Sequence, residues 1–146
     1  MNTQDQIKAS GSLLVVLTKP NGEKEEHFFK NLVVNVGKDF VASRMVGTAS
    51  AVMSHMAIGS GTTAAAGGDT ALETELGRVA LAGSSATNNV VTYTATFPAG
   101  TGTGAVTEAG ILNNSTGGTL LCRTVFAVVN KGVDDAMSVT WTVTVS

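Results

Sequence analysis

The segment from Ala136 to Ser146 alternates strictly between apolar and hydroxyl side chains. Its apolar members are Met137, Val139, Trp141, Val143 and Val145, and the residues between them are serines and threonines. A repeat of two residues places all the apolar side chains on one face of a β-strand and all the hydroxyls on the other. The pattern therefore predicts a strand with Trp141 in a core and a polar face turned to water or to a partner.

Most of the remaining chain has the same character, with strand-like segments separated by clusters of Gly, Pro, Asn and Asp. We expect strands at 12–18, 25–30 (open to extension through 34), 51–58, 78–82, 90–97, 105–113, 119–128 and 136–146. We expect loops or turns at 59–69, 84–89, 98–104, 114–118 and 130–135. Pro20-Asn21-Gly22-Glu23 has the composition of a tight hairpin turn between the first two strands. The segment from Thr70 to Leu76 fits either one helical turn or an extended connection.

One helix is expected, from Gly37 to Val46. Phe40, Val41, Arg44 and Met45 share a face at helical spacing, and Gly47 ends the helix. Short strands with regular turn signals predict an all-β fold, an antiparallel β-sandwich that is jelly-roll-like, with one short helix near residues 37–46. We divide the chain into a flexible N-terminal segment, 1–11, and a single β-sandwich domain, 12–146.

One hairpin register follows from placing the turn at residues 113–118. Leu112 then faces Thr119, and Ala109 faces Cys122. On the opposite face, Glu108 lies across from Arg123 as an opposite-charge pair. These are the only charges in their strands, so we expect an oligomer interface to cover them, and Glu108 and Arg123 are our candidate interface residues.

The chain has few residues that could perform chemistry. It contains two histidines, His27 and His55, and one cysteine, Cys122, without any metal-ligand or nucleophile–base spacing. The Gly59–Thr63 segment is rich in glycine, but it lacks the lysine and the following helix of a phosphate loop. We therefore expect no catalytic, cofactor-binding or metal-binding residues, no cofactor and no enzymatic activity.

Charge limits the possible partners. Charged residues are 14% of the chain and the formal net charge is −2, so no basic surface is expected for nucleic acid or for an anionic membrane. Charges are absent from Met45 to Gly68, and Glu108 is the only one between Val79 and Cys122. We expect this uncharged middle to be buried in the fold or against a partner. The alternative is that its Ser, Thr and Asn side chains make it polar enough to face water. The polar start is unlike a signal peptide, and a single cysteine fits assembly in a reducing cytoplasm.

Several short segments carry a resemblance to a known family. They are 56–63 (MAIGSGTT), 68–72 (GDTAL), 75–80 (ELGRVA), 93–97 (YTATF), 107–111 (TEAGI) and 123–126 (RTVF). Together they resemble small β-rich virion structural proteins of tailed bacteriophages, over roughly 32–146. Some members of that family are described as capsid decoration or cement proteins, and others as tail-fibre proteins.

The resemblance implies a non-enzymatic structural protein of the virion that associates with itself. The expected function is that of a capsid cement protein, which binds the shell of major capsid protein and stabilises it. The expected partners are the major capsid protein and further copies of the chain, as a homotrimer ahead of a dimer. The expected location is the capsid surface, after assembly in the host cytoplasm. The alternative is a tail-fibre or baseplate component that attaches to the host, where a glycan is one candidate target.

Overall fold

The structure, a computed structural model, describes residues 6–47 and 51–146. This part of the chain forms one helix, α1 (Asn35–Met45), and a 9-stranded sheet. The strands are β1 (Ala9–Thr18), β2 (Lys24–Val33), β3 (His55–Gly59), β4 (Glu75–Ala80), β5 (Gly83–Thr87), β6 (Val90–Phe97), β7 (Gly104–Leu112), β8 (Leu120–Lys131) and β9 (Ala136–Val145). Every strand pairing is antiparallel, which confirms the all-β fold with one short helix.

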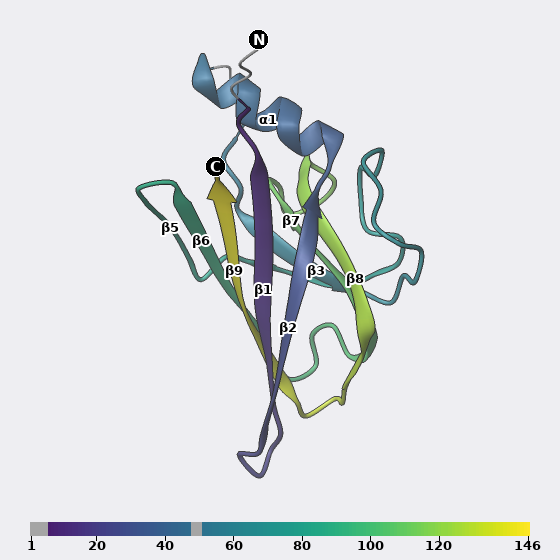
Figure 1. The fold of residues 1–146 in the computed structure, drawn as a ribbon. Coiled ribbons are helices and arrows are strands. Elements are labelled where there is room, and N and C mark those ends of the chain that lie inside the picture. Colours follow the sequence, from purple (N-terminus) through teal and green to yellow (C-terminus); the bar gives the residue numbers. More distant parts are fainter. Residues whose placement is uncertain (1–5, 48–50) are drawn as a thin grey trace.

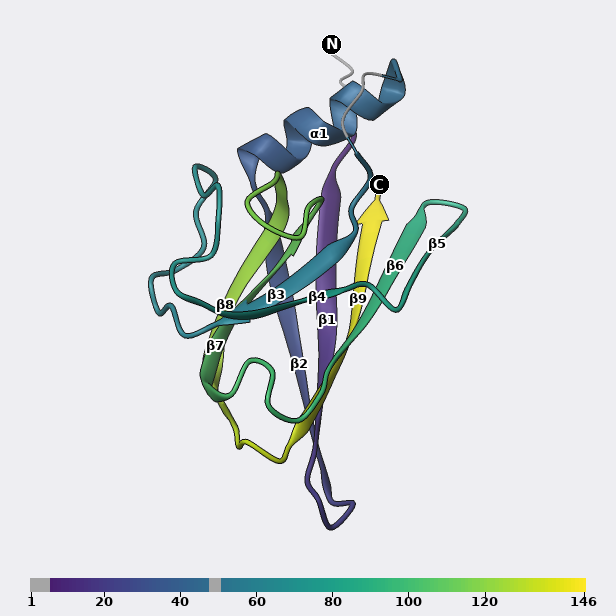
Figure 2. The same ribbon diagram turned by 180° about the vertical axis from the view of Figure 1, so that it is seen from behind.

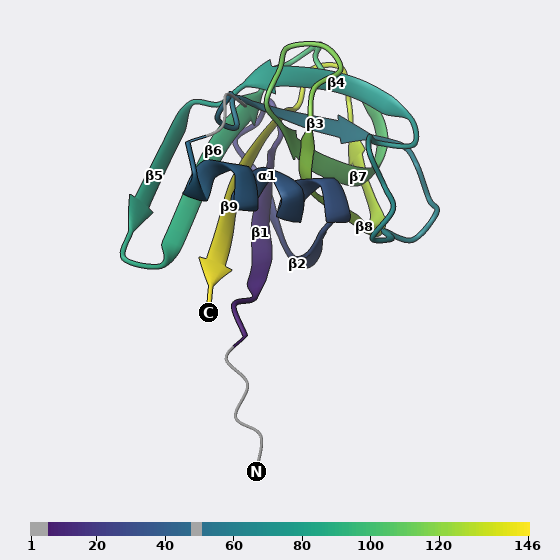
Figure 3. The ribbon, with the colours of Figure 1, turned by 90° about the horizontal axis from the view of Figure 1, so that it is seen from above.

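The strands follow the order β4-β3-β7-β8-β2-β1-β9-β6-β5 in a single curled sheet. The curl brings the half made of β5, β6, β9, β1 and β2 to face the half made of β8, β7, β3 and β4 (Figures 2 and 3). Helix α1 lies across one end of the molecule. The β1–β2 and β8–β9 turns lie at the opposite end (Figure 1). None of the helices among residues 6–47 and 51–146 is long and apolar enough to cross a membrane.

The main core lies between the two halves of the curled sheet. On β9 the side chains of Met137, Val139 and Trp141 are buried, while Ser138 and Thr140 between them are exposed, as the alternation predicted. Buried residues of β1 and of the opposite half complete this core, among them Leu13, Val15, Leu17, Met56, Ile58, Ile111 and Cys122. Trp141 is fully buried and thereby defines the inner face of the sheet.

The expected β1–β2 hairpin is present. The amide of Lys19 donates to the carbonyl oxygen of Glu23 at 2.8 Å, and Gly22 has a φ of +88°, which a glycine adopts without strain. Strand β2 extends to Val33. Strand β1 begins at Ala9, so residues 9–11, which we assigned to the flexible N-terminal segment, belong to the sheet.

Several element boundaries differ from those expected. Residues 84–89, expected to be a turn, form most of β5 and its turn; β5 is exposed on both faces, so it has no apolar alternation to reveal it. Strand β3 begins at His55 rather than at residue 51. Residues 48–50, which precede the expected start at residue 51, lie outside the described part of the chain. Strand β4 occupies Glu75–Ala80 instead of 78–82, and residues 71–74 before it form an irregular connection rather than a helical turn.

Helix α1 starts slightly earlier than predicted and ends before Gly47, whose φ is +68°. Its contact with the sheet depends on Gly37, the one buried residue of the helix, because a Cβ atom there would collide with the backbone of Leu121 in β8. The predicted apolar face is only partly used: Phe40 and Val41 pack on the core, but Met45 is 77% exposed.

The predicted β7–β8 register is wrong by two residues. Gly110, not Glu108, lies opposite Arg123, and Glu108 lies opposite Val125. One residue of the shift arises at the turn, where Leu112 lies opposite Leu120 rather than Thr119. The second arises at an irregularity between Ile111 and Leu112, which sequence alternation cannot reveal. An even shift keeps every side chain on its own face, so Glu108 and Arg123 still share one.

Candidate interaction surfaces

Glu108 and Arg123 form a buried ion pair on the outer face of β7 and β8. The Nε atom of Arg123 donates to Oε1 of Glu108 at 3.0 Å, and its Nη1 donates to Oδ2 of Asp69 at 2.8 Å. Glu108 is 0% exposed and Arg123 is 2% exposed. Burial lowers the pKa of Arg123, but the hydrogen bonds to Asp69 and Glu108 outweigh it and raise that pKa, so the guanidinium is charged at all working pH values.

The Glu108 carboxylate also holds the long segment between β3 and β4. Oε2 accepts hydrogen bonds from the backbone amides of Gly61 and Thr74, both at 2.7 Å, and Oε1 accepts one from the amide of Glu73 at 2.9 Å. A single carboxylate therefore fastens both ends of the segment 60–74, which we call the β3–β4 loop. The Thr107 hydroxyl adds a hydrogen bond to the carbonyl oxygen of Gly61 at 2.7 Å.

Two further acidic side chains shape the β3–β4 loop from within. Oε1 of Glu73 accepts hydrogen bonds from the amides of Thr62 at 2.9 Å and of Thr63 at 3.3 Å. Hydrogen bonds from Thr63 and Thr62 hold the pKa of Glu73 below its ordinary value. Oδ2 of Asp69 accepts from the amide of Ala66 at 2.9 Å, in addition to Arg123. The acidic residues of this loop are thus occupied by internal contacts.

The glycines of the 59–63 segment have a structural explanation. A Cβ atom on Gly59 or Gly61 would lie within van der Waals overlap of the Glu108 carboxylate, so only glycine lets the backbone approach it this closely. Gly-Ser-Gly followed at a distance by an isolated glutamate was the one sequence signal of this arrangement. We excluded a phosphate loop here, and the structure gives these glycines a different use.

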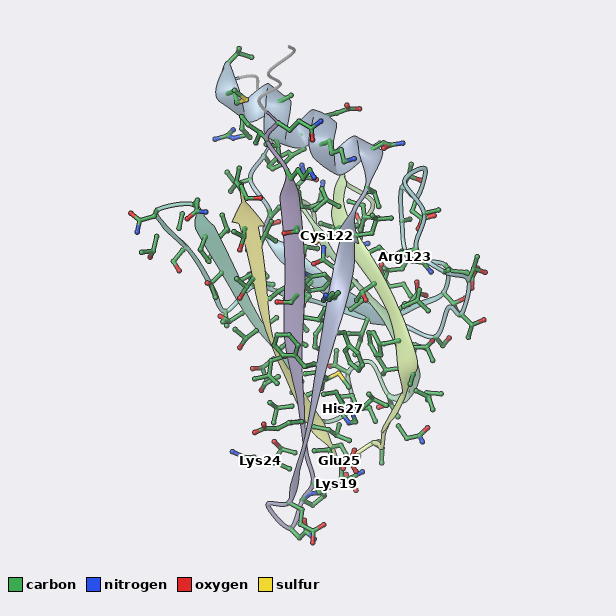
Figure 4. The ribbon with its side chains drawn as sticks, viewed as in Figure 1. Lys19, Lys24, Glu25, His27, Cys122 and Arg123 are labelled. Carbon is green, nitrogen blue, oxygen red and sulfur yellow. The ribbon has the colours of Figure 1, made fainter. Side chains whose placement is uncertain are left out.

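The expected interface role of Glu108 and Arg123 stays a prediction. The structure brings the two residues together, but the β3–β4 loop of the same chain covers them, so their burial requires no second chain. Their visible effect is to give a long, irregular loop one defined position at the side of the sheet. Figure 4 shows Arg123 on the side of β8 that faces this loop.

The other residues considered at the sequence level are dispersed. His27 lies on β2, stacks on Phe29 with ring centroids 6.0 Å apart and has Glu25 at 3.6 Å; the Nδ1 atom of His55 lies 2.8 Å from the Ser54 hydroxyl. Cys122 is fully buried, and burial raises the pKa of its thiol far above the ordinary value. Within residues 6–47 and 51–146, no three His, Cys, Asp or Glu residues are placed to hold a metal ion.

Sequence reasoning missed a second buried charged cluster, at the end of the molecule opposite to α1. The ammonium group of Lys131, which is 2% exposed, donates to the carbonyl oxygens of Pro98 at 3.0 Å and of Asp135 at 2.7 Å. Lys19 donates to Oδ2 of Asp135 at 2.9 Å. The cluster joins the β1–β2, β6–β7 and β8–β9 connections, and Asp135, which lies in the expected turn 130–135, is 5% exposed.

The outer face of β1, β9 and β6 forms an uncharged surface, which we call the hydroxyl face. Its outward residues alternate with the core residues on each strand and include Ser10, Ser12, Leu14, Val16, Ser138, Thr140, Thr142, Thr144, Thr92, Thr94 and Thr96. Cross-strand neighbours place hydroxyl beside hydroxyl, for example Thr94 beside Thr140 and Thr92 beside Thr142. Charged outward side chains begin only on β2, with Glu26 and Lys30.

Comparison of the chain with protein-family models, with curated proteins and with solved structures found no match in any of the three.

Proposed function

We propose that this protein is a non-enzymatic structural protein of a phage virion, a capsid cement protein that binds the assembled shell of major capsid protein. The observation that carries the proposal is the hydroxyl face, a regular surface over three strands without a charged side chain. Such a surface presents many hydrogen-bonding groups at a low desolvation cost, because hydroxyls are less costly to bury than charges. The resemblance of 32–146 to virion structural proteins supplies the partner.

The β3–β4 loop supports the same proposal. Long loops in compact domains are often contact loops, and a contact loop binds best when it is ordered before it meets its partner. Glu108 already holds this loop in one conformation through three backbone hydrogen bonds. Docking of a partner on the loop therefore carries little further cost in conformational entropy.

Particles that lack the protein test the proposal. We expect them to assemble but to lose resistance to heat, because a protein that binds only the assembled shell stabilises it by mass action. Adding back the purified protein should restore the heat resistance. Thr140→Lys, in the middle of the hydroxyl face, should fail to restore it, whereas Asn21→Lys, on the exposed β1–β2 turn, should succeed.

The alternative is a tail-fibre or baseplate component that attaches to the host. It would be supported if particles without the protein keep their heat resistance but lose adsorption to host cells. Copy number gives an independent answer, since cement proteins cover a shell in hundreds of copies and a tail component is present in a dozen or fewer. Equal activity of Thr140→Lys and Asn21→Lys in restoring heat resistance would reject the hydroxyl face as the contact.

A further inference from the structure

The two edge strands of the curled sheet, β4 and β5, differ in the side chains that they carry. At the β4 edge, Arg78 binds the Glu75 carboxylate at 2.7 Å and donates to the carbonyl oxygens of Asn114 and Gly117, both at 2.9 Å. Charged side chains therefore stand on that edge strand. Strand β5, at the other edge of the sheet (Figure 3), carries none: it reads Gly-Ser-Ser-Ala-Thr. Residues 84–87 of β5 are exposed. Protein edges are normally guarded by charges, proline or a covering segment, and β5 has no such guard among the described residues.

The backbone of β5 offers unused hydrogen-bonding groups. Strands β5 and β6 are joined by the two-residue turn Asn88-Asn89, so Thr87 and Val90 exchange hydrogen bonds across the hairpin. By alternation Ser85 also faces β6, while the N–H and C=O groups of Ser84 and Ala86 point away from it. No backbone hydrogen bond joins these outward groups to another segment within residues 6–47 and 51–146.

An apolar hollow lies beside the same edge. It has a volume of about 270 Å³ and is lined mainly by Val52, Met53, Ala86, Val91 and Tyr93. Val52 is 59% exposed, although it is a large apolar side chain. A strand added to β5 would bring side chains over this hollow, which is how strand-addition sites combine backbone hydrogen bonds with side-chain pockets.

We propose that β5 pairs antiparallel with β5 of a second copy of this chain, around a two-fold axis at Ser85. In this register Ser84 of one copy lies opposite Ala86 of the other, so the outward backbone groups of both residues find partners. Ser85 lies opposite itself in a non-hydrogen-bonded pair. A second copy fits because two uncharged edges of small residues meet without repulsion, and because a two-fold contact uses the same surface on both partners.

The pairing makes one sheet continuous across the axis and joins the hydroxyl faces of the two copies. It extends the proposed function but does not depend on it, because purified protein is enough for the test. It also leads to a dimer, whereas at the sequence level we expected a homotrimer ahead of a dimer.

Disulfide trapping tests the register. Cys122 is fully buried, so Ser85→Cys introduces the one readily accessible thiol among the described residues. Opposed residues of a non-hydrogen-bonded antiparallel pair have Cα atoms about 4.5 Å apart, which suits a disulfide. Mild oxidation should convert Ser85→Cys to a covalent dimer on a non-reducing gel. Thr140→Cys, at another exposed position, on the hydroxyl face, is the control and should stay largely monomeric on that gel.

Charge and proline variants test the contact itself by light scattering. Ser85→Lys and Ser85→Glu should each be monomeric because like charges meet at the axis, and an equal mixture of the two should recover the dimer mass. Ser84→Pro removes an N–H group that the monomer does not use, so it should give a monomer with an unchanged circular dichroism spectrum.

Four outcomes would overturn the proposal: a wild-type monomer at high micromolar concentration, a trimer mass, a dimer that survives Ser85→Lys and Ser84→Pro, or an oligomer in which Ser85→Cys does not cross-link. Each of these results can occur whether or not the protein binds a capsid shell. Failure of the β5 pairing is therefore distinguishable from failure of the proposed function.

Discussion

Glu108 and Arg123 are ion-paired at 3.0 Å although they are not cross-strand partners, since Arg123 faces Gly110 across the β7–β8 ladder. The pair is diagonal, because Glu108 lies opposite Val125, two residues along β8 from Arg123. The same carboxylate then receives three backbone amides of the β3–β4 loop. The ion pair therefore fixes the position of the carboxylate that anchors the β3–β4 loop.

Removing the Glu108 side chain should destabilise the protein and release the loop. Glu108→Ala leaves three amides without their acceptor and the buried Arg123 with Asp69 as its remaining carboxylate partner, so we expect a loss of about 3–5 kcal/mol in the free energy of unfolding. Chemical denaturation measures the loss, and hydrogen exchange at the amides of Gly61, Glu73 and Thr74 reports the loop. Unchanged exchange at these amides would contradict the anchoring role of Glu108.

The effects of Glu108→Ala and Arg123→Ala should not add. Once the Glu108 carboxylate is gone, the buried Arg123 guanidinium keeps the partly exposed Asp69 as its carboxylate partner, and removing Arg123 relieves part of the cost. The double variant should therefore be more stable than the sum of the two single losses implies. A double-mutant cycle by denaturation measures this coupling, and strict additivity would show that the two side chains act independently.

Trp141→Ala should cost about 3–5 kcal/mol, because it opens a large cavity in the main core. Trp141→Phe is the matched variant. It keeps most of the ring volume and removes an indole N–H that has no hydrogen-bond partner in the described part of the chain, so it should cost clearly less. In the wild-type protein, Trp fluorescence should be blue-shifted; an emission maximum typical of water would contradict burial.

Gly37→Ala should displace helix α1, because the new methyl group would collide with the backbone of Leu121, which cannot rotate away. We expect a loss of about 1–3 kcal/mol, typical of overpacking. Gly68→Ala is the control, since a Cβ atom there meets nothing within 4 Å. Equal melting temperatures for the two variants would show that α1 does not depend on this close approach.

Asp135 should contribute stability that disappears in acid. The hydrogen bond from Lys19, together with that from the Gly132 amide, lowers the pKa of Asp135 in the folded protein. A carboxyl group with a lowered folded pKa stabilises the fold above its unfolded pKa, about 3.9, and loses this contribution as pH falls through the folded value. The stability difference between wild type and Asp135→Asn should therefore be constant from neutral pH to about pH 5 and shrink below about pH 4.

Asp134→Asn is the control for that measurement, because Asp134 is exposed in the same turn and its carboxylate makes no hydrogen bond or ion pair with the residues that the structure describes. A difference for Asp135→Asn that grows toward low pH would contradict the assigned sign.

Periodicity in the sequence was sufficient where a strand has one buried and one exposed face. Strands β6 and β9 carry that alternation, so their positions and the burial of Trp141 could be predicted. Strand β1 carries instead an unbroken apolar run, residues 13–17, which also predicts a strand. The turn at Asn21-Gly22 was predictable for a local reason, since its backbone demands a residue tolerant of positive φ. Strand β5 was not predictable, because it has no buried face and is held by backbone hydrogen bonds alone.

The contacts that define the candidate surfaces depend on the tertiary structure. The sequence by itself determined that Glu108 and Arg123 are isolated charges in apolar surroundings, and the two-residue alternation put them on one face of a hairpin. It did not determine the partners Asp69, Gly61 and Thr74, nor the Lys19–Asp135–Lys131 cluster, because these contacts join segments far apart in the chain. Local pattern specifies which face a side chain takes, and only the curl of the whole sheet specifies what lies against that face.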